Sequence, residues 1–519
     1  MSEKILNGYY LPDSLSYLED KLEFRELAVD DFVVKVPKIS KEHILEIVSV
    51  LKKNRDEFLS TITIDEVAET YDRVSKKWAD KEYQHKKIAM ELLPKLTNLS
   101  PELIEFFQFS TLYKIDARTI KFLASMELNA EFLKTFVAFN DVNAMLRGFA
   151  SFTAKIKLLS QIKTQKKIKL ITYITPKNVP GLIEALGIFL STVAKASSVT
   201  KTPSAQPVFA PLFARSIREV NKDVGETMVV VPWKGGTFEI EDVLFKNSDV
   251  ISIVSSTETV NSVRKRINAF RKKGYKIKGC YHGGKFGLVV ISKEYAIKDV
   301  ALLAALDAIG YEGYMCSSPA FGFFVEHGGE LSPEQFAEHM ADAAEKLGSL
   351  IPQTQFFRKL REKELAHILV DSAMDAGVKI INTPSKSATV VYYPKPKVNP
   401  NGQNRLIKVM PINDVYDVFG LVRNWRDYYQ TIGVAMPHKK LLKFAEKAGK
   451  LGFSNIRVVG TVTLPRLGEA WDGNLPVIEF FIEDIVHWIS INTKDIDNEI
   501  SKLTEKIQQF IETKKQIIF

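Results

Sequence analysis

The sequence predicts an α/β fold in which a largely parallel sheet follows an N-terminal helical region. Between Lys169 and Val290, short apolar runs of strand length alternate with amphipathic stretches of helical length. This alternation is typical of parallel strands that are connected by helices. From about residue 40 to residue 165, by contrast, apolar residues recur with helical spacing, and residues that favour helix starts precede several of these stretches.

The composition is that of an ordinary globular protein. The chain has 519 residues, 45% hydrophobic and 26% charged, which is enough for two or three domains with sizeable cores. The net charge of +9 comes from 71 basic and 62 acidic residues that are scattered along the chain. Such a modest excess suits anionic small ligands such as a dinucleotide, and we expect no nucleic-acid partner. The densest basic run, Lys163–Lys169, is either a solvated loop or helix end, or a phosphate contact.

Cysteine usage and hydropathy predict a cytoplasmic protein without a transmembrane segment. Only Cys280 and Cys316 are present, so there is no disulfide framework, and the N-terminus lacks a secretion signal. The most apolar segment, Gly181–Val193, is shorter than the roughly 20 residues that a membrane-spanning helix needs.

Local patterns predict the individual elements. A β-like run at 31–36 precedes helices that we expect to be capped by Ser40, Thr63 and Ser100. Buried strands are expected at 170–174, 192–200, 228–231, 250–254 and 288–291. Farther along, the sequence predicts a strand at 321–326, a helix at 332–347, strand and loop over 379–410, and an amphipathic helix at 493–515. That last helix is expected to pack on its own subunit or on a neighbouring one.

Cys316 is the candidate nucleophile. A thiolate suits thioester chemistry, because thioester exchange is nearly isoenergetic and the acyl-enzyme stays reactive toward hydride. Cys316 falls in a predicted turn between a helix and a strand, where Ser317 and Ser318 leave room for a substrate and Pro319 fixes the backbone. On local grounds alone, however, a cysteine is more often a small core residue.

Two further candidates follow predicted strands. Asn178 lies between Pro176 and Pro180, directly after the strand at 170–174, and its amide can donate to a developing oxyanion. The alternative is a turn asparagine that bonds its own backbone. Lys201 leaves the next strand and can point into a ligand crevice, although lone lysines are usually solvated.

The strand at 250–254 runs into a predicted helix start. Ser255 with Glu258 forms a capping box, and the N–H groups of such a start can hold a pyrophosphate; a plain helix cap is the alternative. No GxGxxG follows any strand, and the eight His and two Cys show no metal-ligand spacing. Gly283 and Gly284 are weak signals, and His282 and His327 are more often structural than catalytic.

The order and spacing of these pieces resemble the aldehyde dehydrogenase superfamily, and within it the long-chain fatty acyl-CoA reductase family, whose best-known member supplies aldehyde for bacterial luminescence. The resemblance covers about two thirds of the chain. It runs through VSKKWADKEYQHKKIAMELLPKLTNLSPELIEFF (74–107), NVPGLIEAL (178–186), KTPSAQPVFAPLFARS (201–216), VVPWKGG (230–236), SSTETV (255–260), HGGKFGLVVIS (282–292), YMCSSPAFGFFVE (314–326) and LPRLGEAWDGNLPV (464–477).

The resemblance implies a dinucleotide-binding α/β domain and an α/β catalytic domain. We expect residues 1–165 to form a β-containing and helical region on the cofactor domain, 166–290 the dinucleotide-binding domain, 291–460 the catalytic domain with the Cys nucleophile, and 461–519 a C-terminal return segment with the amphipathic helix. It also implies a cytoplasmic homo-oligomer that takes part in fatty acid metabolism, with acyl-activating or acyl-transferring enzymes as partners.

The resemblance further implies a mechanism. Cys316 attacks acyl-CoA, CoA leaves, and NADPH, with NADH as the alternative, delivers hydride to the thioester so that aldehyde is released. Asn178 and the backbone N–H of Cys316 would stabilise the oxyanion. Lys201 and Ser256 would bind the ribose and phosphate portions of the cofactor. Thr175, Pro176 and Ser255 are expected beside them, with His282, Gly283 and Gly284 in support and no metal.

The sequence departs from the family patterns at two places that bear on this predicted mechanism. Hydrolytic aldehyde dehydrogenases have a Glu two residues before the Gly-Gly pair, where this chain has Tyr281. Without that carboxylate, water is poorly activated, which favours exchange with CoA. Around Cys316, Tyr314-Met315 and Ser317 replace the family's commoner Gln-Gly-Cys-Leu-Ser-Pro form. The alternatives are an acyl-phosphate or semialdehyde-type reductase, and a catalytically silent acyl-binding subunit of the same fold.

Overall fold

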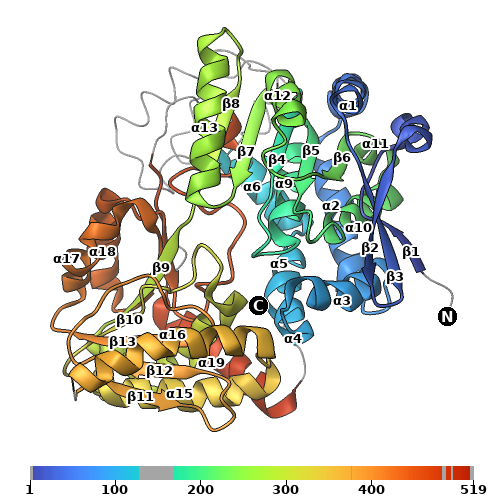
Figure 1. Cartoon of the computed structure of the whole chain (residues 1–519). Helices are drawn as coiled ribbons and strands as arrows, with labels where there is room; N and C mark the ends of the chain where they lie inside the picture. Colours follow the sequence, from blue (N-terminus) through green and yellow to red (C-terminus); the bar gives the residue numbers. More distant parts are fainter. Residues whose placement is uncertain (1–3, 128–167, 376, 482–486, 492–494, 515–519) are drawn as a thin grey trace. The chain divides into compact units, whose positions relative to one another are not determined.

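The computed structural model describes residues 4–127, 168–375, 377–481, 487–491 and 495–514 (Figure 1). The helical pattern expected over 128–165 and most of the basic run at 163–169 therefore lie outside the described residues. The chain forms two compact units, and each of them is made of three separate segments of the sequence. The first unit comprises Met1–Thr97, Gln108–Gly284 and Leu475–Ile485, and the second comprises Asn98–Phe107, Lys285–Asn474 and Val486–Phe519.

The first unit begins with a small sheet and a set of helices. Strands β1 (Lys4–Asn7), β2 (Phe24–Val29) and β3 (Phe32–Pro37) pair in the order β1-β3-β2. Helices α1 (Lys41–Asn54), α2 (Ile64–Ala79), α3 (Gln84–Thr97) and α6 (Ala117–Glu127) follow. The expected caps are confirmed, because the side chains of Ser40 and Thr63 accept from the backbone N–H groups of His43 and Glu66. Ser100 likewise caps α4 (Pro101–Leu103) in the second unit.

A five-stranded parallel sheet forms the core of the first unit. Strands β4 (Leu170–Ile174), β5 (Ser197–Thr202), β6 (Met228–Pro232), β7 (Val250–Val254) and β8 (Lys278–His282) lie in the order β6-β5-β4-β7-β8. Helices α9 (Leu182–Val193), α10 (Phe209–Val220), α12 (Phe238–Asn247) and α13 (Thr257–Lys272) connect them. The strands expected at 170–174, 228–231 and 250–254 are confirmed.

One strand boundary was predicted wrongly. Residues 192–193 end helix α9, and β5 begins only at Ser197, after a turn in which Lys195 has a φ of +53°. The β-branched Thr192 and Val193 favour a strand locally, but they are the last turn of a helix that is buried along almost its whole length. A helix that is buried on all sides has no polar face, so its sequence lacks the alternation of polar and apolar residues that identifies a helix.

The second unit is built on an eight-stranded sheet. Strands β9 (Phe286–Ile291), β10 (Phe323–Glu326), β11 (Lys379–Asn382), β12 (Thr389–Tyr392), β13 (Leu406–Ile412), β14 (Tyr429–Ala435), β15 (Asn455–Val458) and β16 (Ser490–Ile491) lie in the order β11-β12-β13-β10-β9-β14-β15-β16. Only the β11–β12 pair is antiparallel among these. The run at 288–291 forms a strand as predicted, but it pairs with β10 and β14 and not with the strands that precede it.

Helices complete the second unit. They are α14 (Lys298–Ile309), α15 (Pro333–Leu350), α16 (Gln355–Met374), α17 (Val418–Leu421), α18 (His438–Leu451) and α19 (Ile496–Thr513). The predicted helix at 332–347 corresponds to α15, and the predicted C-terminal helix corresponds to α19, which buries Ile496, Ile500, Ile507 and Phe510. Among the described helices, none is both long enough and apolar enough to cross a membrane.

Candidate active site

The carboxyl edge of the five-stranded sheet gathers most of the site residues expected from the sequence. Thr175, Pro176 and Asn178 follow β4, Lys201 lies near the end of β5, Ser255 and Ser256 follow β7, and Gly283 and Gly284 follow β8. Because all five strands are parallel, these ends lie along one edge of the sheet. The strand order also changes direction at β4, which has β5 on one side and β7 on the other. Ligands of open α/β sheets bind at such a point.

Thr175 and Lys201 are held together directly. The backbone N–H and the hydroxyl of Thr175 both donate to the carbonyl oxygen of Lys201, at 3.2 and 3.0 Å. Lys201 is 9% exposed. Burial lowers the pKa of its ammonium group, and the negative charge of Glu241 acts in the opposite direction. A buried ammonium of this kind gains most when an anion binds beside it.

The helix start after β7 is displaced by one residue from its expected position. Ser256, and not Ser255, is the N-cap of α13, and its hydroxyl accepts from the backbone N–H of Thr259 at 3.4 Å. The expected capping box of Ser255 with Glu258 is therefore wrong. The reason is that the N–H of Ser255 still donates to the carbonyl of His282 at 3.1 Å, which extends the pairing of β7 with β8 by one residue. The N-terminus of α13 nevertheless opens at the same sheet edge and provides a positive dipole end.

The loop that carries Asn178 is anchored on both sides. Val179 and Pro180 are buried, whereas Asn178 is exposed. Gly181, with a φ of +94°, is the N-cap of α9, and its N–H donates to the buried carboxylate of Glu184 at 2.7 Å. A side chain at Gly181 would lie 2.4 Å from Nε2 of Gln108, so the loop can pass here only with glycine. Asn178 is thus an exposed residue that directly precedes the anchored part of this loop.

A buried His–Glu pair at the end of β8 was not foreseen. His282 Nε2 lies 3.4 Å from Glu479 Oε2, and their side chains are 8% and 6% exposed. Cys280, on the same strand, is buried and its Sγ lies 4.0 Å from the carbonyl oxygen of Glu479. Sequence reasoning singled out His282 but had no local signal for a partner so distant along the chain.

Cys316 lies in the second unit, in the turn between α14 and β10, as predicted. The turn is closed by hydrogen bonds from Ser318 N to Met315 O (2.9 Å) and from Gly287 N to Ser318 O (2.8 Å). A side chain at Gly287 would lie 2.2 Å from the carbonyl oxygen of Ser317, so this glycine lets β9 run against the turn. His327 lies just beyond the end of β10 and is exposed.

The surroundings of Cys316 act on its thiol in opposite directions. Burial and the negative charge of Asp472 raise the pKa of Cys316, whereas a hydrogen bond from Gln430 and the positive charge of Arg457 lower it. Burial is the largest of these causes, and the net effect is a raised pKa. The resting residue is therefore mainly a thiol at neutral pH.

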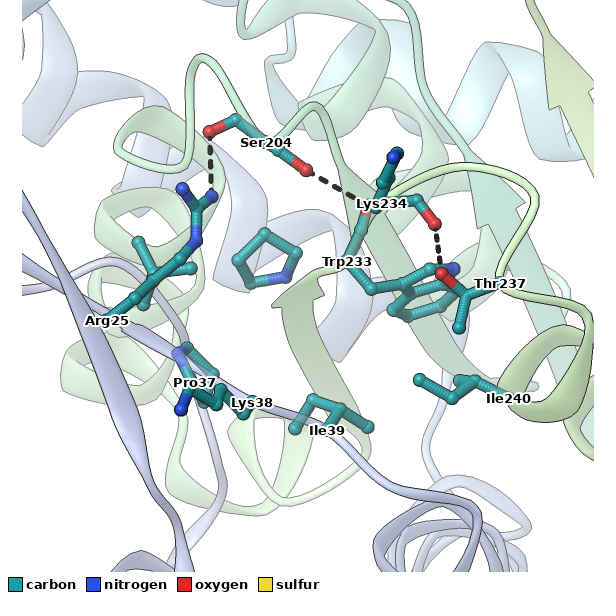
Figure 2. Close-up of a pocket in the computed structure, with 11 residues that line it drawn as sticks. Arg25, Pro37, Lys38, Ile39, Ser204, Trp233, Lys234, Thr237 and Ile240 are labelled. Carbon is teal, nitrogen blue, oxygen red and sulfur yellow. Dashed lines mark hydrogen bonds between the residues drawn. The ribbon is translucent and has the colours of Figure 1, made fainter.

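A pocket of about 460 Å³ lies where β5 and β6 end (Figure 2). Three of its lining residues are cationic, namely Arg25, Lys38 and Lys234, and none of the described lining residues is acidic. Arg25 donates to the carbonyl of Ser204 at 3.2 Å, and the Ser204 hydroxyl donates to the carbonyl of Trp233 at 3.0 Å. Lys38 is also paired with the exposed Glu23. Within the parts of the chain that the structure describes, no group of His, Cys, Asp and Glu could hold a metal ion.

Solved structures similar to this chain show its fold. Methylmalonate-semialdehyde dehydrogenase from Oceanimonas doudoroffii aligns with a TM-score of 0.63 at 14% identity, over 93% of this chain and 96% of that chain. Aldehyde dehydrogenase 21 from Physcomitrella patens gives a TM-score of 0.63 at 12% identity, over 93% and 96%. NADP-dependent glyceraldehyde-3-phosphate dehydrogenase from Bacillus halodurans C-125, complexed with NADP, gives 0.55 at 14% identity, over 88% and 90%.

The chain therefore has the aldehyde dehydrogenase fold, and the expected fold class is confirmed. No curated protein matches it in sequence. Residues 59–482 match the family model described as acyl-CoA reductase (LuxC), and the chain belongs to that family. It is thus a nicotinamide-dependent oxidoreductase of the acyl-CoA reductase type.

Proposed function

We propose that this protein reduces fatty acyl-CoA to aldehyde and free CoA with NADPH, through an acyl-thioester on Cys316. The observation that carries the proposal is the position of Cys316, within the matched family segment, in a closed turn where the neighbouring Ser317 and Ser318 have small side chains. A half-buried cysteine in such a turn can accept an acyl group while its thioester is shielded from water.

Different residues of the chain take part in different steps of the proposed reaction. The thiolate of Cys316 adds to the acyl-CoA carbonyl, the carbon–sulfur bond to CoA breaks, and CoA leaves as a thiolate that takes up a proton. Asn178 is suited to donate its amide to the oxyanion of each tetrahedral state. The nicotinamide cofactor, when bound, supplies the hydride. The resulting thiohemiacetal then releases aldehyde and returns the sulfur of Cys316.

The carboxyl edge of the five-stranded sheet fits a dinucleotide. The N-terminus of α13 offers N–H groups to a pyrophosphate, and Lys201 offers a buried ammonium. Dinucleotide sites that select NAD carry an acidic residue for the ribose 2′-hydroxyl. Here the end of β5 carries Lys201, and the nearby pocket carries Arg25, Lys38 and Lys234. This positive lining favours a ribose that bears a phosphate, which supports NADPH over NADH.

The replacement of the hydrolytic carboxylate supports transfer over hydrolysis. Tyr281 packs its ring against the guanidinium of Arg264 at 4.7 Å, and His282 is paired with Glu479. Neither Tyr281 nor His282 is a carboxylate, and the carboxylate of Glu479 is buried and paired with His282, so none of these three residues offers an exposed carboxylate to activate water. We therefore expect the acyl group to stay on Cys316 until hydride reduces it or until it is transferred back to CoA.

Intact-mass measurement after incubation with acyl-CoA, without cofactor, tests the proposal. The wild type should gain the mass of one acyl group, Cys316→Ala should gain none, and Cys280→Ala should behave as the wild type. A panel of short, medium and long acyl chains that gives no adduct on Cys316 would refute the mechanism. An adduct from an acyl phosphate but not from acyl-CoA would favour the semialdehyde-type alternative. An adduct that NADPH never discharges would identify a silent acyl-binding subunit.

A further inference from the structure

A strained backbone segment immediately precedes Cys316. Tyr311 and Glu312 have φ values of +49° and +54°, in the left-handed region, and Gly313 follows at +80°. Two consecutive residues with side chains in this region are costly and persist only where surrounding contacts enforce them. Both Tyr311 and Glu312 are 1% exposed. Contacts with the surrounding residues therefore impose the backbone conformation of the segment that leads into the Cys316 turn.

A second strained segment holds Tyr311 and Glu312 in this left-handed conformation. Asn404 and Arg405, just before β13, have φ values of +55° and +60°. The N–H of Asn404 donates to the carbonyl oxygen of Glu312 at 2.7 Å. Arg405 donates to Glu312 Oε1 from Nε at 3.0 Å and from its terminal nitrogen at 2.8 Å. The two left-handed segments thus hold each other through both backbone and side chains.

The ion pair between Glu312 and Arg405 is fully enclosed and satisfied. Their side chains are 2% and 0% exposed. The other carboxylate oxygen of Glu312 accepts from Gln353 at 2.7 Å, and Arg405 also donates to the carbonyl of Ile351 at 2.8 Å. A buried ion pair with such geometry contributes more to one fixed arrangement than to net stability, because desolvation offsets much of its attraction.

The same segment contacts the Cys316 turn on both sides of the cysteine. Before it, the hydroxyl of Tyr314 donates to Asn404 Oδ1 at 3.1 Å. After it, the N–H of Gly402 donates to the carbonyl of Ala320 at 3.0 Å. Side chains at Gly313 or Gly402 would lie 2.8 or 2.9 Å from the facing carbonyl oxygens, so the two chains pass at the closest distance that glycine permits.

The segment is itself fixed at its far end. Lys408 on β13 is buried and donates to Asn399 Oδ1 and Asn401 Oδ1, both at 2.8 Å. Residues 399–405 are therefore held at one end by Lys408 and at the other by Arg405. No described contact joins the side chain of Glu312, Arg405 or Lys408 to Cys316 itself, so the effect of these three residues on Cys316 passes through the backbone of the turn.

We propose that Glu312 and Arg405 are positioning residues, which clamp the strained turn so that the sulfur of Cys316 is held in its reactive orientation. The proposal rests on the function proposed above, because it assigns the clamp to the nucleophile. An error of about 1 Å in the position of a reacting group can lower a rate about 100-fold. Loosening the clamp should therefore slow acylation of Cys316 without changing the binding of the cofactor.

The test compares Glu312→Gln and Arg405→Lys with the wild type. Glu312→Gln keeps the shape of the side chain and removes the charge, and Arg405→Lys keeps the charge and removes the paired hydrogen bonds. We expect the rate of Cys316 acylation by acyl-CoA to fall about 10- to 100-fold in each. The Kd for NADPH should stay within about twofold of the wild type. Wild-type acylation rates in variants that are folded at the assay temperature would overturn the proposal.

A matched control separates positioning from loss of stability. Asp249→Asn removes a carboxylate that accepts from the backbone N–H groups of Lys169 (2.8 Å) and Leu170 (3.1 Å), at the opposite edge of the five-stranded sheet. This variant should lower the melting temperature while acylation of Cys316 stays normal. If Glu312→Gln and Arg405→Lys do not fold, Tyr314→Phe removes the hydroxyl that donates to Asn404 and should slow acylation about threefold; an unchanged rate would count against the clamp.

Alkylation keeps this test independent of the proposed function. The rate at which iodoacetamide modifies Cys316, followed by peptide mass spectrometry, depends on the thiol and its position in the turn and not on acyl-CoA. Because Cys280 is buried, modification of Cys280 would report unfolding of a variant. If the wild type takes up no acyl group, the proposed function fails, and altered Cys316 alkylation in the clamp variants still supports the clamp. If acylation occurs but neither acylation nor alkylation differs between wild type and variants, the clamp fails alone.

Discussion

Thr175 donates two hydrogen bonds, from its backbone N–H and its hydroxyl, to the single carbonyl oxygen of Lys201. This contact ties the end of β4 to the end of β5 beside the point where the strand order changes direction. It fixes the backbone from which the Lys201 ammonium extends. The geometry at this edge thus depends on two residues that lie 26 positions apart in the chain.

Lys201→Met should weaken NADPH binding. A hydrogen bond between charged groups contributes about 1.5–3 kcal/mol, so the Kd should rise at least about tenfold. Quenching of intrinsic fluorescence by titrated NADPH would measure it. Thr175→Val, which removes only the hydroxyl bond, should raise the Kd less. Acylation of Cys316 without cofactor should be unaffected by either change; if Lys201→Met bound NADPH normally, Lys201 would have no part in the cofactor site.

Arg25→Ala should reduce discrimination between the two cofactors. Arg25 lines the pocket beside β5 and β6 and is fixed by its bond to the carbonyl of Ser204 (Figure 2). If the pocket receives the ribose phosphate, kcat/KM for NADPH should fall about tenfold while kcat/KM for NADH stays the same. Equal losses with both cofactors, or none, would place the phosphate elsewhere.

Asn178→Ala should lower turnover without disturbing the nucleophile. Removing one oxyanion donor typically costs about 100- to 1000-fold in kcat. Aldehyde formation, followed by loss of NADPH absorbance, should fall by that amount, while alkylation of Cys316 by iodoacetamide keeps its wild-type rate. Lys177→Ala, one residue earlier in the same exposed loop, is the matched control and should retain activity.

Ser256→Ala should destabilise the protein more than Ser255→Ala. Ser256 caps α13, and loss of an N-cap serine typically costs about 1 kcal/mol, whereas only the backbone N–H of Ser255 forms a described bond here. Urea denaturation of both variants would measure the difference. Equal free energies of unfolding would show that the cap does not contribute.

The sequence was sufficient for features that depend on one strand or one helix start. Asn178, Lys201 and Ser256 each follow or end an apolar run, and parallel topology then brings such positions to one edge whatever the details of packing. Ser255 was misplaced as the cap because the pairing of β7 with β8 continues one residue beyond the apolar run. The sequence around Ser255 does not show how far the pairing with the neighbouring strand β8 extends.

Features that depend on distant segments could not be predicted. The sheet to which β9 belongs, the pairing of His282 with Glu479 and the clamp of Glu312 with Arg405 all join residues without any shared local pattern. Glu312 and Arg405 look like ordinary charged residues in the sequence, and only the fold shows that both are buried. The left-handed conformation of Tyr311 was equally hidden, because aromatic residues rarely adopt it.

The raised pKa of Cys316 predicts a steep pH dependence of its reactivity. Because the pKa lies above the ordinary value of 9.0, the thiolate fraction should rise about tenfold for each pH unit between pH 6 and pH 9. The rate of alkylation by iodoacetamide should follow this rise and reach no plateau below pH 9. A plateau near pH 7 in the free protein would show that the thiol is already activated.

Asp472 and Gln430 should shift this profile in opposite directions. Gln430 donates to Asp472 Oδ1 at 3.2 Å, and both act on the thiol. Asp472→Asn removes a negative charge that opposes ionisation, so the pKa of Cys316 should fall and alkylation at pH 8 should become about two- to tenfold faster. Gln430→Leu removes a hydrogen bond that favours the thiolate, so alkylation should become slower. Parallel shifts in the two variants would mean that the turn has moved, and circular dichroism with thermal melting would identify that outcome.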